Sequence, residues 1–151
     1  MLKNIDPLLG PELLKVLCEM GHGDEIVLAD ANFTAESLGR GKPLVRLPGV
    51  GMREACAAVL SVLPLDATVA QPVAFMQVSA TPEGYRSALQ RDVIDQMHSR
   101  GDAAGVQCEA MERFSFYERV SRAYAIVQTG EMQPFANFLF KKGVIAHELA
   151  P

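Results

Sequence analysis

The sequence predicts an α/β fold, namely a single three-layer α/β/α domain with a largely parallel sheet. Short apolar runs of strand length alternate along the chain with longer segments that have helical spacing, which is typical of β-α-β units. Several of these runs are apolar almost throughout, as expected of strands that helices cover on both faces. The chain has 151 residues, of which 49% are hydrophobic, so it fits one domain with a packed core.

The first helix is expected to begin at Pro11, because this residue follows Gly10 and suits the first helical position. Apolar residues at helical spacing continue to Met20, and Gly21 then ends the helix. An apolar strand is expected next at 25–29, between two aspartates.

The middle of the chain repeats the alternation. The polar segment 32–43 is expected to be a loop, and a strand at 44–47 leads through a glycine turn into an alanine-rich helix at about 52–63. Another strand is expected at 69–78, where Pro72 would restrict its start to a sheet edge or a bulge. The remaining elements are expected as a long helix at 82–99, a strand at 106–111, a helix at 114–123, and strands at 124–127 and 138–140.

Composition narrows the class of partner. The formal net charge is −4 and no stripe of lysine or arginine occurs, so nucleic acid is not an expected partner. Neither a signal peptide nor a membrane span is expected. The cysteines Cys18, Cys56 and Cys108 lie far apart without a C-x-x-C pair, which favours free thiols in the cytoplasm. A small molecule or another subunit is therefore the expected partner.

His22 is the first candidate for chemistry. It stands between Gly21 and Gly23, which leave the imidazole approachable, and histidine exchanges protons near neutral pH. Asp24 or Asp30 is a candidate carboxylate to orient it. A loop histidine is also commonly an ordinary surface residue, and spacing alone leaves both interpretations open.

Asp30 directly follows the strand at 25–29, at the edge where open α/β sheets bind ligands. Asp30 could accept a hydrogen bond from a sugar hydroxyl or serve as the N-cap of a following helix. Asn137, ahead of the last strand, could bond to a sugar hydroxyl or simply form a turn. A straight strand would hold His22 and Asp30 about 16 Å apart. They can share a pocket only if the His22 turn folds back over the sheet or if a neighbouring subunit supplies one of them.

Two other kinds of site have little support. Gly49 and Gly51 follow a strand and open a helix, as in a dinucleotide fingerprint, but Glu54 stands where the third glycine belongs. A tight turn is therefore favoured over a nucleotide site. No H-x-x-x-H motif and no cysteine pair occurs, so no metal is expected.

Several segments match a known pattern when they are taken together: 11–17, 20–26, 30–31, 113–114, 116–119, 125–127, 129–131 and 141–144. They include the His-Gly-Asp turn at 22–24, a strand that ends in Asp-Ala, and a Thr-Gly-Glu turn before an aromatic-x-Asn triplet. The chain thereby resembles the L-fucose mutarotases of the RbsD/FucU family over nearly its whole length. The resemblance implies an α/β/α fold and a ring-like homo-oligomer, a decamer in the best-known members, with sugar sites completed across subunit interfaces.

The same resemblance implies interconversion of sugar anomers or ring forms without a metal or an organic cofactor. It makes His22 the proton donor and implies sugar contacts at Asp30, Arg113, Phe135, Ala136 and Asn137. The family triplet usually begins with tyrosine, so Phe135 indicates either a different substrate or a contact through backbone and ring face. The leading hypothesis is an aldose mutarotase acting on L-fucose or a similar sugar. The alternatives are a non-catalytic monosaccharide-binding or regulatory protein on the same scaffold and, third, a nucleotide-dependent enzyme.

Overall fold

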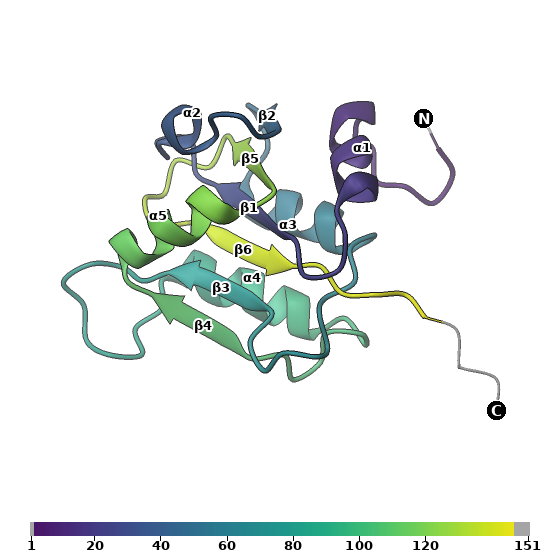
Figure 1. Cartoon of the computed structure of the whole chain (residues 1–151). Coiled ribbons are helices and arrows are strands. Elements are labelled where there is room, and N and C mark those ends of the chain that lie inside the picture. The colour runs from purple at the N-terminus through teal and green to yellow at the C-terminus, as the bar shows by residue number, and fades with distance from the viewer. Residues whose placement is uncertain (1, 147–151) are drawn as a thin grey trace.

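A computed structural model describes residues 2–146 of the chain. Within this range the helices are α1 (Pro11–Glu19), α2 (Ala35–Leu38), α3 (Met52–Leu60), α4 (Ala88–His98) and α5 (Arg113–Arg122). The strands are β1 (Glu25–Ala29), β2 (Leu44–Leu47), β3 (Val73–Met76), β4 (Cys108–Met111), β5 (Ala125–Thr129) and β6 (Phe138–Lys141). Figure 1 shows how the helices surround the sheet.

The six strands form one sheet in the order β2-β5-β1-β6-β3-β4. β6 runs antiparallel to both of its neighbours, β1 and β3, whereas the other neighbouring strands pair in parallel. β6 alone among the described strands therefore opposes the rest, which confirms the expected, largely parallel sheet. Because it is reversed, β6 begins at the edge of the sheet where the parallel strands end.

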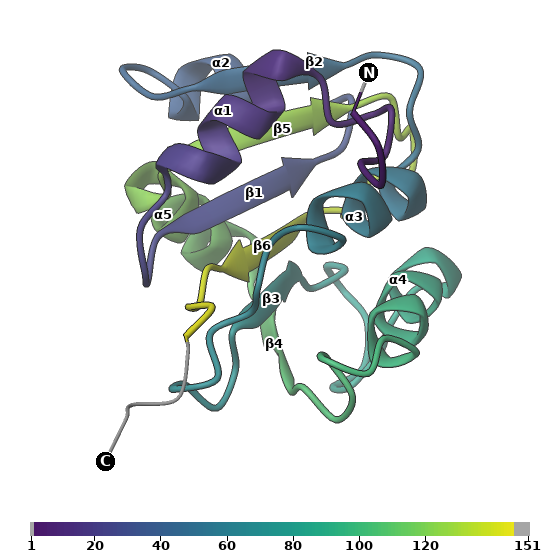
Figure 2. The same ribbon diagram turned by 90° about the vertical axis from the view of Figure 1, so that its right-hand side faces the viewer.

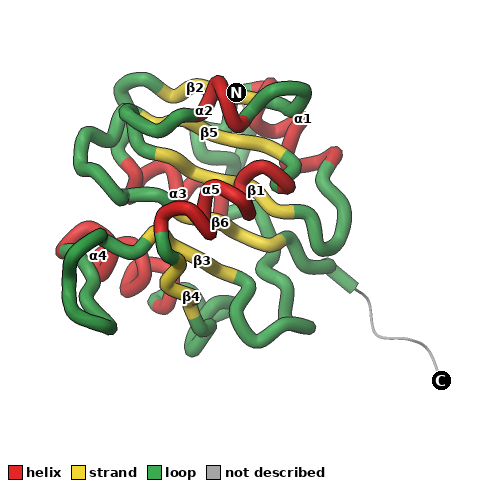
Figure 3. The backbone as a smooth tube through the Cα atoms, turned by 60° about the vertical axis from the view of Figure 1, so that its left-hand side comes forward, coloured by secondary structure: helices red, strands yellow, loops and turns green. Residues whose placement is uncertain are grey.

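Helices cover both faces of the sheet. The side chains of β1 alternate between two apolar clusters: Ile26 and Leu28 pack with α1, α3 and α4, whereas Val27 and Ala29 pack with α2 and α5. Figures 2 and 3 show the two helical layers from different sides of the sheet. The alternation follows from the two-residue period of a strand, and the three-layer α/β/α arrangement is confirmed.

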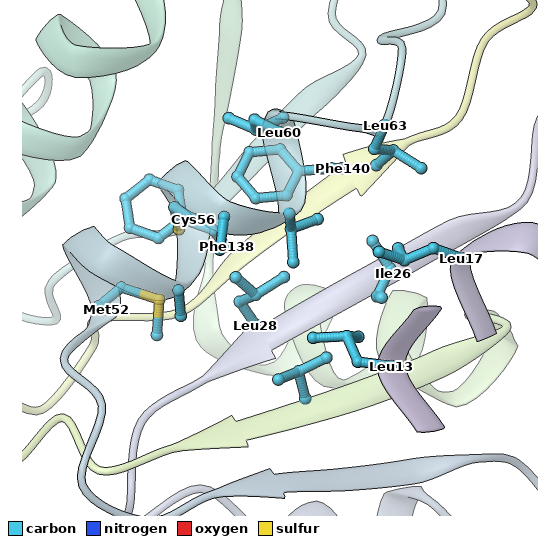
Figure 4. Close-up of a cluster of buried hydrophobic side chains, with 14 of the residues drawn as sticks. Leu13, Leu17, Ile26, Leu28, Met52, Cys56, Leu60, Leu63, Phe138 and Phe140 are labelled. Atoms are coloured by element: carbon cyan, nitrogen blue, oxygen red, sulfur yellow. The ribbon is translucent and has the colours of Figure 1, made fainter. Parts of the chain in front are cut away.

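The larger cluster forms where α1 and α3 lie on the sheet (Figure 4). Phe138 and Phe140 of β6 are fully buried there, beside Leu28 of β1 and Met52 and Cys56 of α3. Burial of the Cys56 thiol raises its pKa far above the ordinary value, so this thiol stays protonated and contributes packing.

Phe138→Ala should lower the free energy of unfolding by about 3–5 kcal/mol, because it removes a buried ring and leaves a cavity between two strands and a helix. Guanidinium unfolding measures the change. Phe114→Ala is the matched control, since Phe114 is 66% exposed and its loss should change stability by about 0.5 kcal/mol or less. Equal losses in the two variants would contradict this description of the core.

The expected boundaries were wrong in several places. The expected loop at 32–43 contains the short helix α2, and α4 begins at Ala88 instead of residue 82, because Ser87 caps it. An edge or a bulge was expected at Pro72; β3 lies between β6 and β4, so the edge alternative was wrong. Pro72 causes no gap in the sheet, because it precedes the first residue of β3 and its carbonyl accepts a hydrogen bond from Lys141 N (2.8 Å). Within residues 2–146, no helix has both the length and the apolar character of a membrane span.

Candidate functional site

His22 lies at the amino end of β1, on a turn that backbone hydrogen bonds hold in place. Asp24 accepts a bond from Gly21 N through Oδ2 (2.7 Å) and returns one from its own N to Gly21 O (3.2 Å). Gly23 has a φ of 85°, a left-handed conformation that favours glycine, and its N donates to Lys142 O (2.8 Å). The Asp24 carboxylate thus closes the turn, and the carboxylate that faces the imidazole is a different one.

That carboxylate belongs to Asp66. His22 Nε2 lies 3.2 Å from Asp66 Oδ1, and the His22 side chain is 47% exposed while that of Asp66 is only 4% exposed. The hydroxyl and amide of Thr68 donate to the same oxygen at 2.6 and 3.0 Å. These hydrogen bonds, together with His22, lower the pKa of Asp66 to about 2. An ionised, buried carboxylate therefore orients an accessible imidazole.

Lys142 fixes this turn to the end of α1. Its Nζ donates to the carbonyls of Leu17 (2.7 Å) and Met20 (2.6 Å), which the helix itself leaves unpaired. Its backbone N donates to Asp24 O and its backbone O accepts from Gly23 N, each at 2.8 Å. One residue directly after β6 thus joins the helix, the His22 turn and the sheet.

Lys142→Met should loosen the His22 turn, because it removes both side-chain hydrogen bonds and keeps most of the apolar stem. We expect a loss of about 1–3 kcal/mol in unfolding free energy and faster amide hydrogen exchange at Gly23. Lys15→Met is the matched control: Lys15 pairs with Glu19 on the solvent side of α1 and should leave both measurements nearly unchanged. Unaltered exchange at Gly23 in Lys142→Met would contradict the proposed link.

Asp30 and Asn137 meet at the carboxyl edge of the sheet. Asp30 N donates to Asn137 Oδ1 and Asn137 Nδ2 donates to Asp30 Oδ2, both at 2.8 Å. Asp30 Oδ1 accepts a further bond from Asn32 N (2.9 Å). Because α2 begins only at Ala35, after Thr34, Asp30 is not its N-cap.

Both side chains of this pair are almost fully buried, with Asp30 at 4% and Asn137 at 1% exposure. Burial raises the pKa of Asp30 above its ordinary value, although the hydrogen bonds from Asn137 and the backbone partly offset the shift. The carboxylate uses one hydrogen bond on each oxygen and retains acceptor capacity. The pair is a rigid acceptor-rich group at the edge where a ligand is expected.

The two residues before Asn137 lie at the same edge but differ in backbone conformation and in the burial of their side chains. Phe135 has a φ of 64°, which is unusual for a residue other than glycine, and its side chain packs partly against the cluster under α2 and α5. The Ala136 side chain is fully buried, so only its backbone is suited to touch a ligand. The predicted contact at Ala136 would therefore be a main-chain contact.

Arg113 begins α5, just after β4 ends. Its guanidinium lies over the rings of Phe114 (5.1 Å) and Tyr117 (5.6 Å), which hold a cation through their π faces. It lines a pocket of about 210 Å³ together with Gln77, Val78, Ser79, Ala80 and Glu112. β3 separates β4 from β6, so Arg113 shares the edge with Asn137 but stands two strand positions from it, roughly 10 Å along the sheet.

The structure thus brings the predicted sugar contacts to one edge of the sheet and places His22 at the other. β1 has five residues, and the His22 turn precedes it while Asp30 follows directly after it. The hydrogen bonds to Lys142 hold the turn at the amino end, so it does not fold back over the sheet. Within one chain, His22 and Asp30 do not share a pocket.

The glycine turn before α3 does not form a phosphate site. Met52 N, at the start of the helix, donates to Glu131 Oε2 (3.3 Å), and a Cβ at Gly51 would lie 2.6 Å from Glu54 Oε2. Two carboxylates at this helix end would repel a phosphate. Among residues 2–146, no three His, Cys, Asp or Glu side chains gather in a group that could hold a metal ion.

Comparison with known proteins shows which family the chain belongs to. The pattern of the RbsD / FucU transport protein family matches residues 3–145. The chain is 44% identical to the fucose mutarotase of Bos taurus, over 97% of this chain and 95% of that protein. It is 40% identical to the L-fucose mutarotase of Actinobacillus pleuropneumoniae serotype 5b (strain L20), over 95% and 97% of the two chains.

Solved structures agree in fold. The fucose mutarotase of Streptococcus pneumoniae, determined in complex with L-fucose, superposes with a TM-score of 0.82 at 40% identity, over 96% of this chain and 100% of that one. The resemblance inferred from the segments around His22, Asp30 and Thr129 is thereby confirmed, and the chain belongs to the RbsD/FucU family.

Proposed function

We propose that this protein interconverts the anomers of L-fucose or a closely related monosaccharide by acid/base ring opening and reclosure, in support of carbohydrate metabolism. The observation that carries the proposal is the accessible imidazole of His22 backed by the buried carboxylate of Asp66. The three mutarotases named above support the sugar and the reaction.

Anomer exchange needs only proton transfers and a bond rotation. A base removes the proton of the anomeric hydroxyl while an acid protonates the ring oxygen, and the C–O bond of the ring breaks to give an aldehyde. The aldehyde rotates, the ring oxygen attacks its other face, and the proton transfers reverse. His22 is proposed to donate the proton to the ring oxygen, and Asp66 would stabilise the imidazolium before that transfer.

The other predicted residues would hold the sugar. Asp30 and Asn137 present an ionisable acceptor and an amide that are fixed to one another, which suits neighbouring hydroxyls. Arg113 would add a charged donor at the far side of the same edge. Phe135, with no hydroxyl, would offer its ring face and backbone, and Ala136 its backbone.

A site of this kind requires a second subunit, because His22 and Asp30 lie at opposite ends of β1. We propose a homo-oligomer, a ring-like decamer, in which His22 of one chain completes the Asp30 edge of the next. Large apolar side chains that remain exposed in the single chain are consistent with subunit contacts; they include Leu2, Met132, Val144 and Ile145. The chain is proposed to act as a single domain over residues 1–151.

A cytoplasmic location is also proposed. Its support is that Cys18, Cys56 and Cys108 are free thiols in the described structure, as suits a reducing compartment.

Saturation-transfer NMR on equilibrated L-fucose tests the activity directly, because it reports exchange between anomers when no net product forms. The protein should accelerate exchange in proportion to its concentration. Binding of L-fucose without accelerated exchange would favour the alternative, a sugar-binding or regulatory protein on this scaffold. A panel of other 6-deoxy sugars and pentoses, measured in the same way, identifies the substrate if fucose is not preferred.

A further inference from the structure

Gln90 is a buried polar side chain on α4 that the proposed mechanism does not use. It is fully buried, and each of its polar atoms is bonded to the backbone. Oε1 accepts from Ser87 N (3.0 Å), whereas Nε2 donates to Met76 O (2.8 Å) and Phe135 O (3.1 Å). A buried amide with all of these bonds made is rigid, because losing any one of them would leave a polar group unpaired.

The two carbonyls that Gln90 holds both lie next to the sugar-binding edge. Met76 is the last residue of β3, and its N donates to Asn137 O (3.0 Å). Phe135 opens the segment 135–137 that carries Asn137. Gln90 therefore ties the end of β3 and the start of this segment to the same helix.

The conformation of Phe135 indicates why such a tie is needed. A φ of 64° is disfavoured for phenylalanine and persists only where surrounding contacts hold it. The hydrogen bond to Phe135 O fixes the peptide that leads to Ala136 and then to Asn137. Asn137 in turn is hydrogen-bonded to both the amide and the carboxylate of Asp30. Three hydrogen bonds therefore connect Gln90 of α4, through Phe135 and Asn137, to the side chain of Asp30.

The capping box of α4 does not by itself explain a glutamine here. Ser87 and Gln90 form that box, in which Ser87 Oγ accepts from Gln90 N (3.2 Å). Glutamate serves equally well at this position of a capping box, because only an acceptor is needed. The side chain of glutamate has no N–H donor, however, and could not donate to Met76 O and Phe135 O.

We propose that Gln90 is a positioning residue for the sugar site, acting through Phe135 and Asn137 on Asp30. The inference rests on the proposed function, since it assumes that these residues hold the sugar. Gln90 touches no sugar itself. Its loss is expected to weaken binding and to leave the proton transfer intact, since the side chain of Gln90 bonds only to Ser87, Met76 and Phe135 and the His22 proposed to act at this edge belongs to the neighbouring chain.

The test compares Gln90→Met, Gln90→Glu and the control Ser87→Ala. Gln90→Met removes all three side-chain bonds, Gln90→Glu keeps the cap acceptor but loses both donors, and Ser87→Ala removes the serine side of the cap alone. Calorimetry with L-fucose should show affinity reduced roughly 10-fold in both Gln90 variants and changed less than about twofold in Ser87→Ala. At saturating sugar the exchange rate should remain close to that of the wild type.

Wild-type affinity in folded Gln90→Met would overturn the inference while leaving the proposed function untouched. If Gln90→Met does not fold, Gln90→Asn carries the same test, because it keeps an amide but is too short to reach both carbonyls. Equal loss of affinity in Ser87→Ala would also overturn the inference, since it would trace the effect to helix capping.

A second readout needs no sugar. The side-chain amide resonances of Asn137 should shift in Gln90→Met and stay in place in Ser87→Ala, because only the former releases the segment 135–137. If the wild type neither binds nor exchanges L-fucose, the proposed function fails, and this spectrum still decides whether Gln90 orients Asn137. Unmoved Asn137 resonances in Gln90→Met would reject the positioning role even in an active enzyme.

Discussion

His22→Gln is expected to lower the rate of anomer exchange by about 10²–10⁴-fold while L-fucose affinity stays close to that of the wild type. Glutamine keeps a hydrogen-bonding group that can face Asp66, but it cannot deliver a proton near neutral pH. A rate that falls without a change in affinity marks a group that acts in the transition state. NMR measures the exchange rate, and calorimetry measures binding.

His98→Gln is the matched control for this experiment. His98 ends α4, where its Nε2 lies 2.7 Å from Val106 O, a backbone contact that involves neither His22 nor Asp66. The exchange rate of this variant should stay within about twofold of the wild type. Wild-type exchange in folded His22→Gln would remove its role as proton donor and make a sugar-binding protein the better interpretation.

Mixed assemblies of two impaired variants should regain activity. Asp30→Asn replaces the charged acceptor by a neutral one, so it should weaken sugar binding markedly. If His22 and Asp30 of different chains form each site, assemblies of His22→Gln and Asp30→Asn chains in equal amounts contain some sites with both native residues. With random neighbours, about a quarter of the sites are complete, and exchange should recover to about a quarter of the wild-type rate.

The two variants must be co-expressed so that their chains assemble together. Mixing them after separate purification, without subunit exchange, is the control and should restore nothing. A chain that carries both substitutions, co-expressed with wild type, verifies that the mutant chains enter the assembly. Co-expressed single variants that remain as inactive as each one alone would show that no site is shared between chains.

The elements that the sequence predicted best are those whose boundaries depend on local chemistry. Gly10 and Pro11 mark the start of α1, and the apolar run between two aspartates is β1, as expected. The predicted start of α4 at residue 82 is wrong, because Ser87 and Gln90 have the spacing of a capping box and the helix begins after Ser87. α2, with four residues, is too short for a periodic pattern to identify.

The sequence predicted only those features of the site that depend on residues close together in the chain. His22 and Asp30 flank one strand, so their separation followed from strand geometry. The partners Asp66, Gln90 and Lys142 were not predictable, since each acts across a long stretch of sequence. Asp66 is 44 residues from His22, Gln90 is 45 from Phe135, and Lys142 is 125 from Leu17. Such contacts depend on how the sheet brings strands together, which no local pattern encodes.

The position of β6 between Asn137 and Lys142 predicts how the exchange activity depends on protein concentration. The strand begins directly after Asn137 and ends directly before Lys142, so one rigid strand joins the hydroxyl-holding end of a chain to its proton-donating end. In the proposed assembly each chain would therefore serve two different sugars, one at each end. A closed ring leaves no end unmatched, whereas an opened ring has one incomplete site at its break. Specific activity should then fall at low protein concentration while every subunit is still folded.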